Sequence, residues 1–163
     1  MEQGDLEWVR KQRNRPECMM WFRQPLPLTE EQQLEWFTTT DMKSFIVLDS
    51  EGDRAGVVSL SKIDHIARKC EFSIMITPEL RGFGYGKEAL IELLTIAFDK
   101  LNMRQVYSDV FDNNPALAMY KEMGFLRVGN LPNWYFKNGK YVSSEIIILQ
   151  KDEYNRLKQT IPE

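Results

Sequence analysis

Cysteine and histidine are scarce in this sequence, and their scarcity excludes whole classes of site. The 163 residues include two cysteines, Cys18 and Cys70, and one histidine, His65. The cysteines lie far apart without a CxxC spacing, so these three side chains do not form an ordinary zinc set. We therefore expect no metal, and two reduced thiols as in a cytoplasmic protein.

Long apolar runs and an excess of positive charge are absent as well. No run approaches the roughly 20 apolar residues of a membrane-spanning helix, and the segment MEQGDLEWVRKQRNR lacks the apolar core of a signal peptide. The formal net charge of −3 offers no general attraction for nucleic-acid phosphates. We expect neither a membrane nor a nucleic acid as a partner.

The residues that are present favour one globular domain. Hydrophobic residues make up 43% of the chain and aromatic residues 12%, which is enough for a substantial core. No internal repeat or Gly/Ser linker divides the sequence. We expect residues 1–163 to form a single domain.

Apolar spacing and turn signals predict a mixed sheet packed by helices. Helices are expected after Asp5, ending at Pro16, after the capping-box residue Thr29, after the glycine-rich stretch near residue 85, and after Asn114. Strands are expected in SFIVLDS, AGVVSLS, CEFSIMIT, RQVYSDVF, FLRVGN and SSEIIILQ, with a tight NG turn before the last one.

The stretch RGFGYGKEAL, residues 81–90, has glycine at every second position and then turns into good helix formers. A strand, a glycine loop and a helix N-terminus together suit an anion, because free N–H groups and the helix dipole converge there. A Walker loop would need Gly at 81 and Ser or Thr at 88, and a dinucleotide fingerprint starting at Gly82 would need Gly at 87. The sequence matches neither loop. Two interpretations remain, namely an anion-binding loop of the pattern Arg81-x-x-Gly84-x-Gly86 and a plain glycine turn.

A second motif lies downstream. The segment from Asn114 to Phe125, NPALAMYKEMGF, resembles the pattern Asn-x-x-Ala-x-x-x-Tyr-x-x-x-Gly-Phe, and it follows the glycine loop after a helix and a strand. Together the two motifs resemble the GNAT superfamily of acyl-CoA N-acyltransferases, from about residue 5 to residue 154. Within it, the chain looks most like the branch of ribosomal-protein N-terminal, polyamine and amino-sugar acetyltransferases.

The resemblance implies an α/β fold of the α+β type, with a mostly antiparallel sheet of about six strands flanked by about four helices. In relatives a strand usually precedes the first helix, so here that first edge strand is expected to be absent or shortened. The resemblance also implies that the strand 71–77 splays from the strand 105–111 and offers backbone groups, at Ile74 and Ile76, to the pantetheine arm of acetyl-CoA. The pyrophosphate would bind the main-chain N–H groups of Arg81, Gly82, Phe83, Gly84, Tyr85, Gly86 and Lys87.

The resemblance further assigns catalytic roles. Tyr120 would protonate the leaving thiolate, unless it is a packed tyrosine that only orders the cofactor. Glu71 would accept the proton of the amine, directly or through water, unless it is a solvated carboxylate at a strand end. Asn114 is either a cofactor contact or a helix cap, and His65, in a charged connector, is expected at the surface.

The predicted function is therefore N-acetylation of a primary amine by acetyl-CoA, by direct attack in a ternary complex, since neither cysteine lies in a motif. The acceptor is a small-molecule amine or a protein N-terminus, and a homodimer is an open possibility. Alternatives are a catalytically silent acyl-CoA-binding or scaffold domain and a nucleotide phosphate site. Acceptor contacts are expected among Asp109, Asp112 and Glu145. The aromatic residues either line the acceptor cleft, as the resemblance implies, or belong to the core, namely Trp21, Phe22, Trp36, Trp134 and Tyr135.

Overall fold

In the computed structural model, which describes residues 1–160, six strands form one mixed sheet in the order β1-β2-β3-β4-β6-β5. The strands are β1 (Lys43–Leu48), β2 (Arg54–Asp64), β3 (Lys69–Ile76), β4 (Gln105–Phe111), β5 (Leu126–Lys137) and β6 (Lys140–Gln150). Only β3 and β4 pair in parallel, and every other neighbouring pair is antiparallel. The predicted mixed, mostly antiparallel six-stranded sheet is confirmed.

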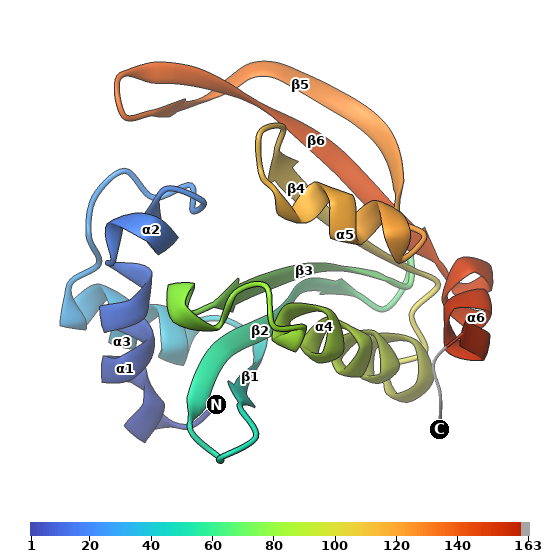
Figure 1. Ribbon diagram of the computed structural model, residues 1–163, viewed down its shortest axis with the longest axis horizontal. Coiled ribbons are helices and arrows are strands. Elements are labelled where there is room, and N and C mark those ends of the chain that lie inside the picture. Colours follow the sequence, from blue (N-terminus) through green and yellow to red (C-terminus); the bar gives the residue numbers. More distant parts are fainter. Residues whose placement is uncertain (161–163) are drawn as a thin grey trace.

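The described residues contain six α-helices rather than the expected four. They are α1 (Leu6–Arg13), α2 (Pro16–Met19), α3 (Glu30–Thr39), α4 (Tyr85–Thr95), α5 (Ala116–Glu122) and α6 (Lys151–Thr160). The prediction that Pro16 ends the first helix is wrong: α1 stops at Arg13, and Pro16 opens α2, because a missing N–H costs nothing at the first helical position. Figure 1 shows α1 to α3 grouped beside one end of the sheet and α6 at the other.

The helix predicted after the glycine loop forms the centre of the core. Helix α4 packs against β2 and β3 and continues into a π-helical turn, η3 (Ile96–Lys100). Spacings of three and four predict an apolar face of six residues, and five of them are buried, namely Leu90, Leu93, Leu94, Ala97 and Phe98, whereas Leu101 is half-buried. Two short 3-10 helices, η1 (Gln3–Asp5) and η2 (Pro78–Leu80), complete the described elements.

Strands β5 and β6 form a long hairpin that arches above the rest of the sheet (Figure 1). The predicted NG turn is present, with Asn138 and Gly139 both at positive φ. The expected strand FLRVGN is too short, because β5 runs on to Lys137. Its ladder with β6 is irregular between Leu131 and Tyr135, and Pro132 is tolerated there because β5 is an edge strand.

No strand precedes α1 in residues 1–160, so β1 is the outer strand on that side of the sheet. The ammonium of Met1 donates to the outward carbonyl of Ser44 at 2.9 Å. Asp5 occupies the expected cap position of α1, yet its carboxylate accepts from the backbone of Glu2 and from Arg54 rather than from α1. None of the helices in this described part is long and apolar enough to cross a membrane.

Candidate active site

The cleft of this protein lies where β3 and β4 separate. Their parallel ladder has three pairs and ends at Glu71 opposite Tyr107, although both strands continue, to Ile76 and Phe111. The expected splay is therefore confirmed. A cleft of about 1000 Å³ opens there, lined by both strands, the glycine loop, α5 and the segment from α1 to α3.

The glycine loop presents a row of free backbone donors to this cleft. Gly82 and Gly84 have φ of 82° and 94°, a conformation that side chains disfavour, and Gly84 is the N-cap of α4. Within residues 1–160, none of the N–H groups from Gly82 to Gly86 donates to another group of the chain. Five successive donors at the positive end of a helix make an anion site.

The two ends of the predicted loop behave differently from its centre. The N–H of Arg81 donates to Pro78 and that of Lys87 to Gly84, so these two are not free as expected. The guanidinium of Arg81 donates to the carbonyls of Ile76 and Glu17 and to Cys18 Sγ, which ties the loop to α2.

Most of the predicted cofactor residues line the cleft, and two do not. Those that line it are Ile74, Ile76, Arg81, Gly82, Gly84, Gly86, Lys87 and Asn114. The side chain of Phe83 is 74% exposed, and neither Phe83 nor Tyr85 is part of the lining. Alternate residues of this loop point away from the cleft, so only the backbone of these two can contribute.

Tyr120 lies on α5 and lines the cleft from the side of β4. Its ring is buried and packs edge to face against Phe72, with ring centroids 5.4 Å apart. Its hydroxyl makes no hydrogen bond within the described residues and remains open to a ligand. Burial raises the pKa of Tyr120 well above its ordinary value, so the phenol stays protonated.

Asn114 caps α5 and lines the cleft at the same time. Its side-chain oxygen accepts from the N–H of Ala116 at 2.9 Å, which leaves the amide nitrogen for a ligand. In the motif pattern, the asparagine stands seven residues before the tyrosine. Counted back from Tyr120, this spacing selects Asn113. That residue is exposed and outside the lining, so Asn114 is the asparagine of the cleft.

Glu71 is buried at the closed end of the cleft and is held by two cations. Its carboxylate lies 3.2 Å from Arg23 Nη2 and 2.7 Å from Lys62 Nζ. Lys62 reaches it from a bulge in β2, where its own φ is positive. The alternative reading of Glu71 as a solvated strand-end carboxylate is wrong, because its side chain is 9% exposed.

A second carboxylate, Asp109 of β4, lies beside this pair. Arg23 Nη2 is 3.3 Å from its Oδ2, and the hydroxyl of Tyr135 donates to the same oxygen at 2.5 Å. The other oxygen, Oδ1, is buried and has no partner in the described residues. Burial, followed by the bond to this carboxylate, raises the pKa of Tyr135 to about 12. Glu71, Asp109 and Arg23 thus form one polar cluster.

The remaining expected acceptor residues divide between the cleft and the surface. Trp21, Phe22 and Trp36 line the cleft. Trp134 is 64% exposed, Asp112 is exposed, and Glu145 pairs with Arg127 at 3.0 Å outside the lining. His65 is exposed in a turn, as expected.

Both cysteines are free and buried. Burial raises the pKa of Cys70 to about 11, and it raises the pKa of Cys18 although Arg81 lies close. Protonated thiols are poor nucleophiles. This chemistry agrees with direct transfer between two bound substrates.

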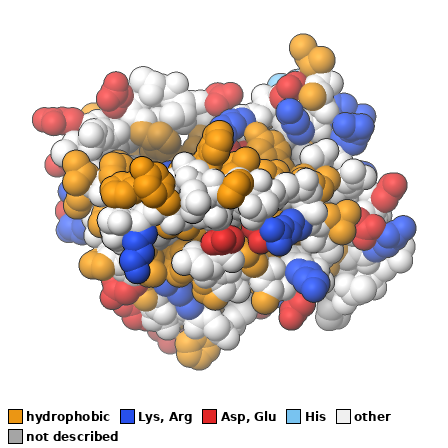
Figure 2. Space-filling view, turned by 90° about the horizontal axis from the view of Figure 1, so that it is seen from above, with side chains coloured by type: hydrophobic (Ala, Val, Ile, Leu, Met, Phe, Trp, Pro, Cys, Tyr) orange, Lys and Arg blue, Asp and Glu red, His pale blue; other side chains and the backbone are white. Residues whose placement is uncertain are grey.

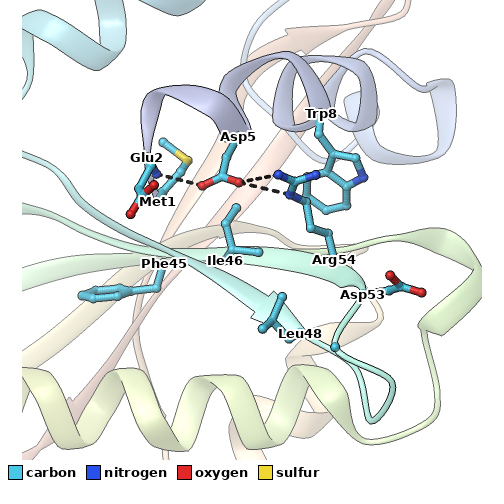
Figure 3. Close-up of a pocket in the computed structure, with 10 residues that line it drawn as sticks. Met1, Glu2, Asp5, Trp8, Phe45, Ile46, Leu48, Asp53 and Arg54 are labelled. Atoms are coloured by element: carbon cyan, nitrogen blue, oxygen red, sulfur yellow. Dashed lines mark hydrogen bonds and ion pairs between the residues drawn. The ribbon is translucent and has the colours of Figure 1, made fainter.

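A second hollow of about 810 Å³ lies on another part of the surface, beside the N-terminal turn (Figure 3). The pair of Asp5 and Arg54, 2.9 Å apart, stands at its wall, with Trp8 and Phe45 nearby. None of the predicted site residues lines it. Across residues 1–160, no three His, Cys, Asp or Glu side chains gather into a set that could hold a metal ion.

Sequence reasoning missed Arg23 and Lys62 as partners of Glu71. Arg23 is separated from Glu71 by 48 positions and sits in a proline-flanked connector with no local signal. Lys62 was missed because the bulge that directs its side chain toward Glu71 cannot be predicted from the sequence of β2 alone. Only the folded chain brings these charges together.

The geometry agrees with what is known of similar proteins. Residues 1–125 match the acetyltransferase (GNAT) domain family. The spermidine N(1)-acetyltransferase of Vibrio cholerae is 32% identical over 162 residues, which covers 96% of this chain and 94% of the relative. The enzyme of the same description from Escherichia coli K12 is 28% identical, covering 94% and 85%. A crystal structure of the Vibrio cholerae spermidine N-acetyltransferase with CoA and spermine superposes with a TM-score of 0.87, at 28% identity and 95% coverage of both chains.

Proposed function

We infer that this chain, which belongs to the GNAT acetyltransferase family and is an acetyl-CoA-dependent N-acetyltransferase, acts on a small-molecule primary amine. The free N–H groups from Gly82 to Gly86 carry this proposal, because Gly82, Gly84 and Gly86 line the cleft between β3 and β4. They suit the pyrophosphate of the coenzyme, and the free edge of β3 beyond Glu71 suits its pantetheine arm.

We assign proton transfer at the amine to Glu71. An ordinary primary amine has a pKa near 10 and is mostly protonated at neutral pH, so a base must take its proton before or during attack. The Glu71 carboxylate stands at the closed end of the splay, where the thioester would lie. Arg23 and Lys62 hold it in place.

Tyr120 is assigned to the leaving group. The amine nitrogen attacks the thioester carbon, the C–S bond breaks, and the phenol gives its proton to the sulfur. The high pKa of Tyr120 keeps this proton available. A thiolate that departs into the same apolar surroundings has its own pKa raised too, which offsets the rise in the pKa of Tyr120.

The developing oxyanion needs a donor, and the unpaired edge of β3 provides candidates. Residues 72–76 pair with β2 on one side, and on the other side their ladder to β4 has ended. Backbone N–H groups on that edge are positioned before the reaction and need no reorganisation. We therefore place the thioester carbonyl on the free edge of β3 just beyond Glu71, with the pantetheine arm continuing along Ile74 to Ile76.

An amine panel tests the proposed function. The purified chain is incubated with acetyl-CoA and with spermidine, spermine, an amino sugar, an amino acid or a short peptide, and free thiol is measured. Polyamines are tested first because similar proteins are spermidine N-acetyltransferases. Thiol release with a small amine supports the proposal. Tight CoA binding by calorimetry without release for any amine would favour the silent-domain alternative.

We also propose that residues 1–163 work as one domain, in the cytoplasm, and as a homodimer. The outer face of β5 and β6 carries exposed apolar side chains, among them Val128, Trp134, Phe136 and Tyr141. Figure 2, seen from the side of this hairpin, shows hydrophobic patches on the surface. Such patches are rare on monomers. Sedimentation analysis of the wild type and of Phe136→Ser tests the dimer, which the substitution should weaken.

A further inference from the structure

Two cations that contact Gln24, a residue of the cleft wall, have no carboxylate partner. Arg13, at the end of α1, lines the cleft, and Lys137, at the tip of the β5–β6 hairpin, is 7% exposed. Neither forms an ion pair within residues 1–160. Burying an unpaired charge costs free energy. Two such cations that contact one residue therefore indicate that an anionic group binds here.

Both cations converge on one residue, Gln24. Arg13 Nη2 donates to Gln24 Oε1 at 2.7 Å, and Lys137 Nζ donates to the Gln24 carbonyl at 2.6 Å. Arg13 Nε and Gln24 Nε2 are buried donors that lack an acceptor in the described residues. The group therefore has a surplus of donors and positive charge, and its acceptors are already in use.

The guanidinium of Arg13 is held in a fixed orientation. It lies over the ring of Phe22, with 4.6 Å from Cζ to the centroid, and near the ring of Trp36 at 5.7 Å. Burial lowers its pKa to about 10, which leaves it charged at neutral pH. Its Nη1 makes no internal hydrogen bond and is not among the buried atoms, so two N–H donors face accessible space. A fixed planar fork with free donors suits a carboxylate.

This group belongs to the acceptor end of the cleft. Gln24 follows Arg23, whose guanidinium touches both Glu71 and Asp109. Arg13, Gln24 and Glu71 all line this one cleft, so an amine placed at Glu71 for acetylation would share it with the Arg13 fork. The glycine loop, where the phosphates of the coenzyme are placed, is joined instead to α2 through Arg81.

We propose that Arg13, Gln24 and Lys137 form a subsite for an anionic group of the acceptor, so that the preferred substrate is an amine that also carries a carboxylate. This inference rests on the proposed function and narrows its substrate class. Arg13 and Gln24 contact the carboxylate, while Lys137, which is outside the lining, adds positive potential from behind.

Matched pairs of acceptors test the subsite. Thiol release is measured for 4-aminobutanoate against n-butylamine, for glycine against glycinamide, and for spermidine. The carboxylated member of each pair should have a kcat/KM at least about 10-fold higher, as expected for a charge-assisted hydrogen bond. Arg13→Gln should bring this ratio close to one by raising the KM of the carboxylated amine, with the KM of acetyl-CoA unchanged.

Two further variants separate this effect from a folding defect. Lys137→Met keeps the packed stem and should lower the ratio by a smaller factor than Arg13→Gln. Lys11→Gln removes an exposed cation from the same helix as Arg13 and should change nothing. Thermal melting of all variants shows whether the fold is retained.

Three results would overturn the proposal. The first is a preference for spermidine or butylamine that Arg13→Gln leaves unaltered. The second is a rise in the KM of acetyl-CoA alone in Arg13→Gln, which would assign the cations to the coenzyme. The third is the absence of thiol release with every amine, which would overturn the proposed function together with its subsite.

Discussion

Glu71 lies opposite Tyr107 in the last pair of the ladder between β3 and β4, and the strands separate at the next residue of each. A carboxylate is thereby placed where the backbone stops pairing and the cleft begins. The same interruption frees backbone donors for a thioester and sets a base beside them. The site thus depends on the absence of pairing between β3 and β4 beyond Glu71 as much as on any side chain.

Glu71→Gln should lower kcat by about 10²–10³-fold, the usual contribution of general base catalysis. Glutamine keeps the size and can still accept from Arg23, but it cannot take a proton from the amine. Steady-state thiol release at saturating acetyl-CoA measures the effect. Glu145→Gln, which alters a carboxylate paired with Arg127 outside the cleft, is the matched control. An unchanged kcat would assign the proton to a water chain.

Tyr120→Phe should lower kcat by about 10²-fold without weakening CoA binding. The fold should be retained, because the hydroxyl makes no hydrogen bond in the described residues and the ring packing on Phe72 survives. Since burial raises the pKa of Tyr120, the wild type should show no alkaline loss of rate from this phenol up to about pH 10. Full turnover in the variant would leave Tyr120 with a packing role only.

Gly86→Ala should weaken CoA binding while the melting temperature is not lowered. The added methyl would lie 3.6 Å from Ile76 and 3.9 Å from Ile74, within the wall of the cleft, and alanine favours the helix by about 1 kcal/mol. Calorimetric titration with CoA measures the loss. Gly4→Ala, with no neighbouring atom within 4 Å, is the control. Undiminished affinity would place the coenzyme away from this helix turn.

Gly84→Val is a less clean test of the glycine loop than Gly86→Ala. Gly84 has a φ of 94°, so any side chain there strains the backbone regardless of space. Weaker CoA binding by that variant could come from backbone strain in the loop as well as from a side chain that blocks the coenzyme. Gly86, whose φ is not in the left-handed region, gives the cleaner test.

Asp99→Asn should destabilise the protein at neutral pH, by about 1 kcal/mol after allowance for solvent screening. Asp99 accepts from Lys151, Lys158 and Tyr154, and these bonds hold its pKa below the ordinary value. A depressed pKa in the folded state means that the stabilisation is present above about pH 4 and is lost as the pH falls further.

Urea unfolding of Asp99→Asn and wild type at pH 7 and at pH 3 checks this prediction. The difference between the two proteins should shrink at the lower pH, because the carboxylate of Asp99 then takes up a proton in the unfolded wild-type chain but not yet in the folded one. Asp152→Asn, an exposed position on α6, the helix that carries the three partners of Asp99, should behave as wild type. A difference that is constant with pH would show that charge is not the cause.

Cys18→Ala should keep kcat within about threefold of the wild type, and no burst of thiol should precede steady turnover. The thiol is buried with a raised pKa, so it does not supply a thiolate at neutral pH. Rapid-mixing measurement of thiol release checks both statements. A burst of one thiol per chain that disappears in the variant would indicate an acyl-enzyme and contradict direct transfer.

The sequence alone determined those parts of the protein that depend on local physics. The alternation of apolar residues located the six strands, the spacing of Leu90, Leu93 and Leu94 located the buried helix, and the NG pair located the hairpin turn. The glycine loop was recognisable because backbone donors at a helix start need residues without side chains. Proline was misread at residue 16 because it is acceptable at both a helix stop and a helix start.

The tertiary structure decided which charges meet. Arg23, Lys62 and Glu71 come from three separate segments. Gln24 contacts both Arg13 and Lys137, although Lys137 lies 113 positions further along the chain. Contacts of this kind depend on strand order, bulges and the reach of a hairpin, none of which leaves a periodic pattern. The sequence therefore identified the coenzyme loop, whereas only the fold revealed how the acceptor end is charged.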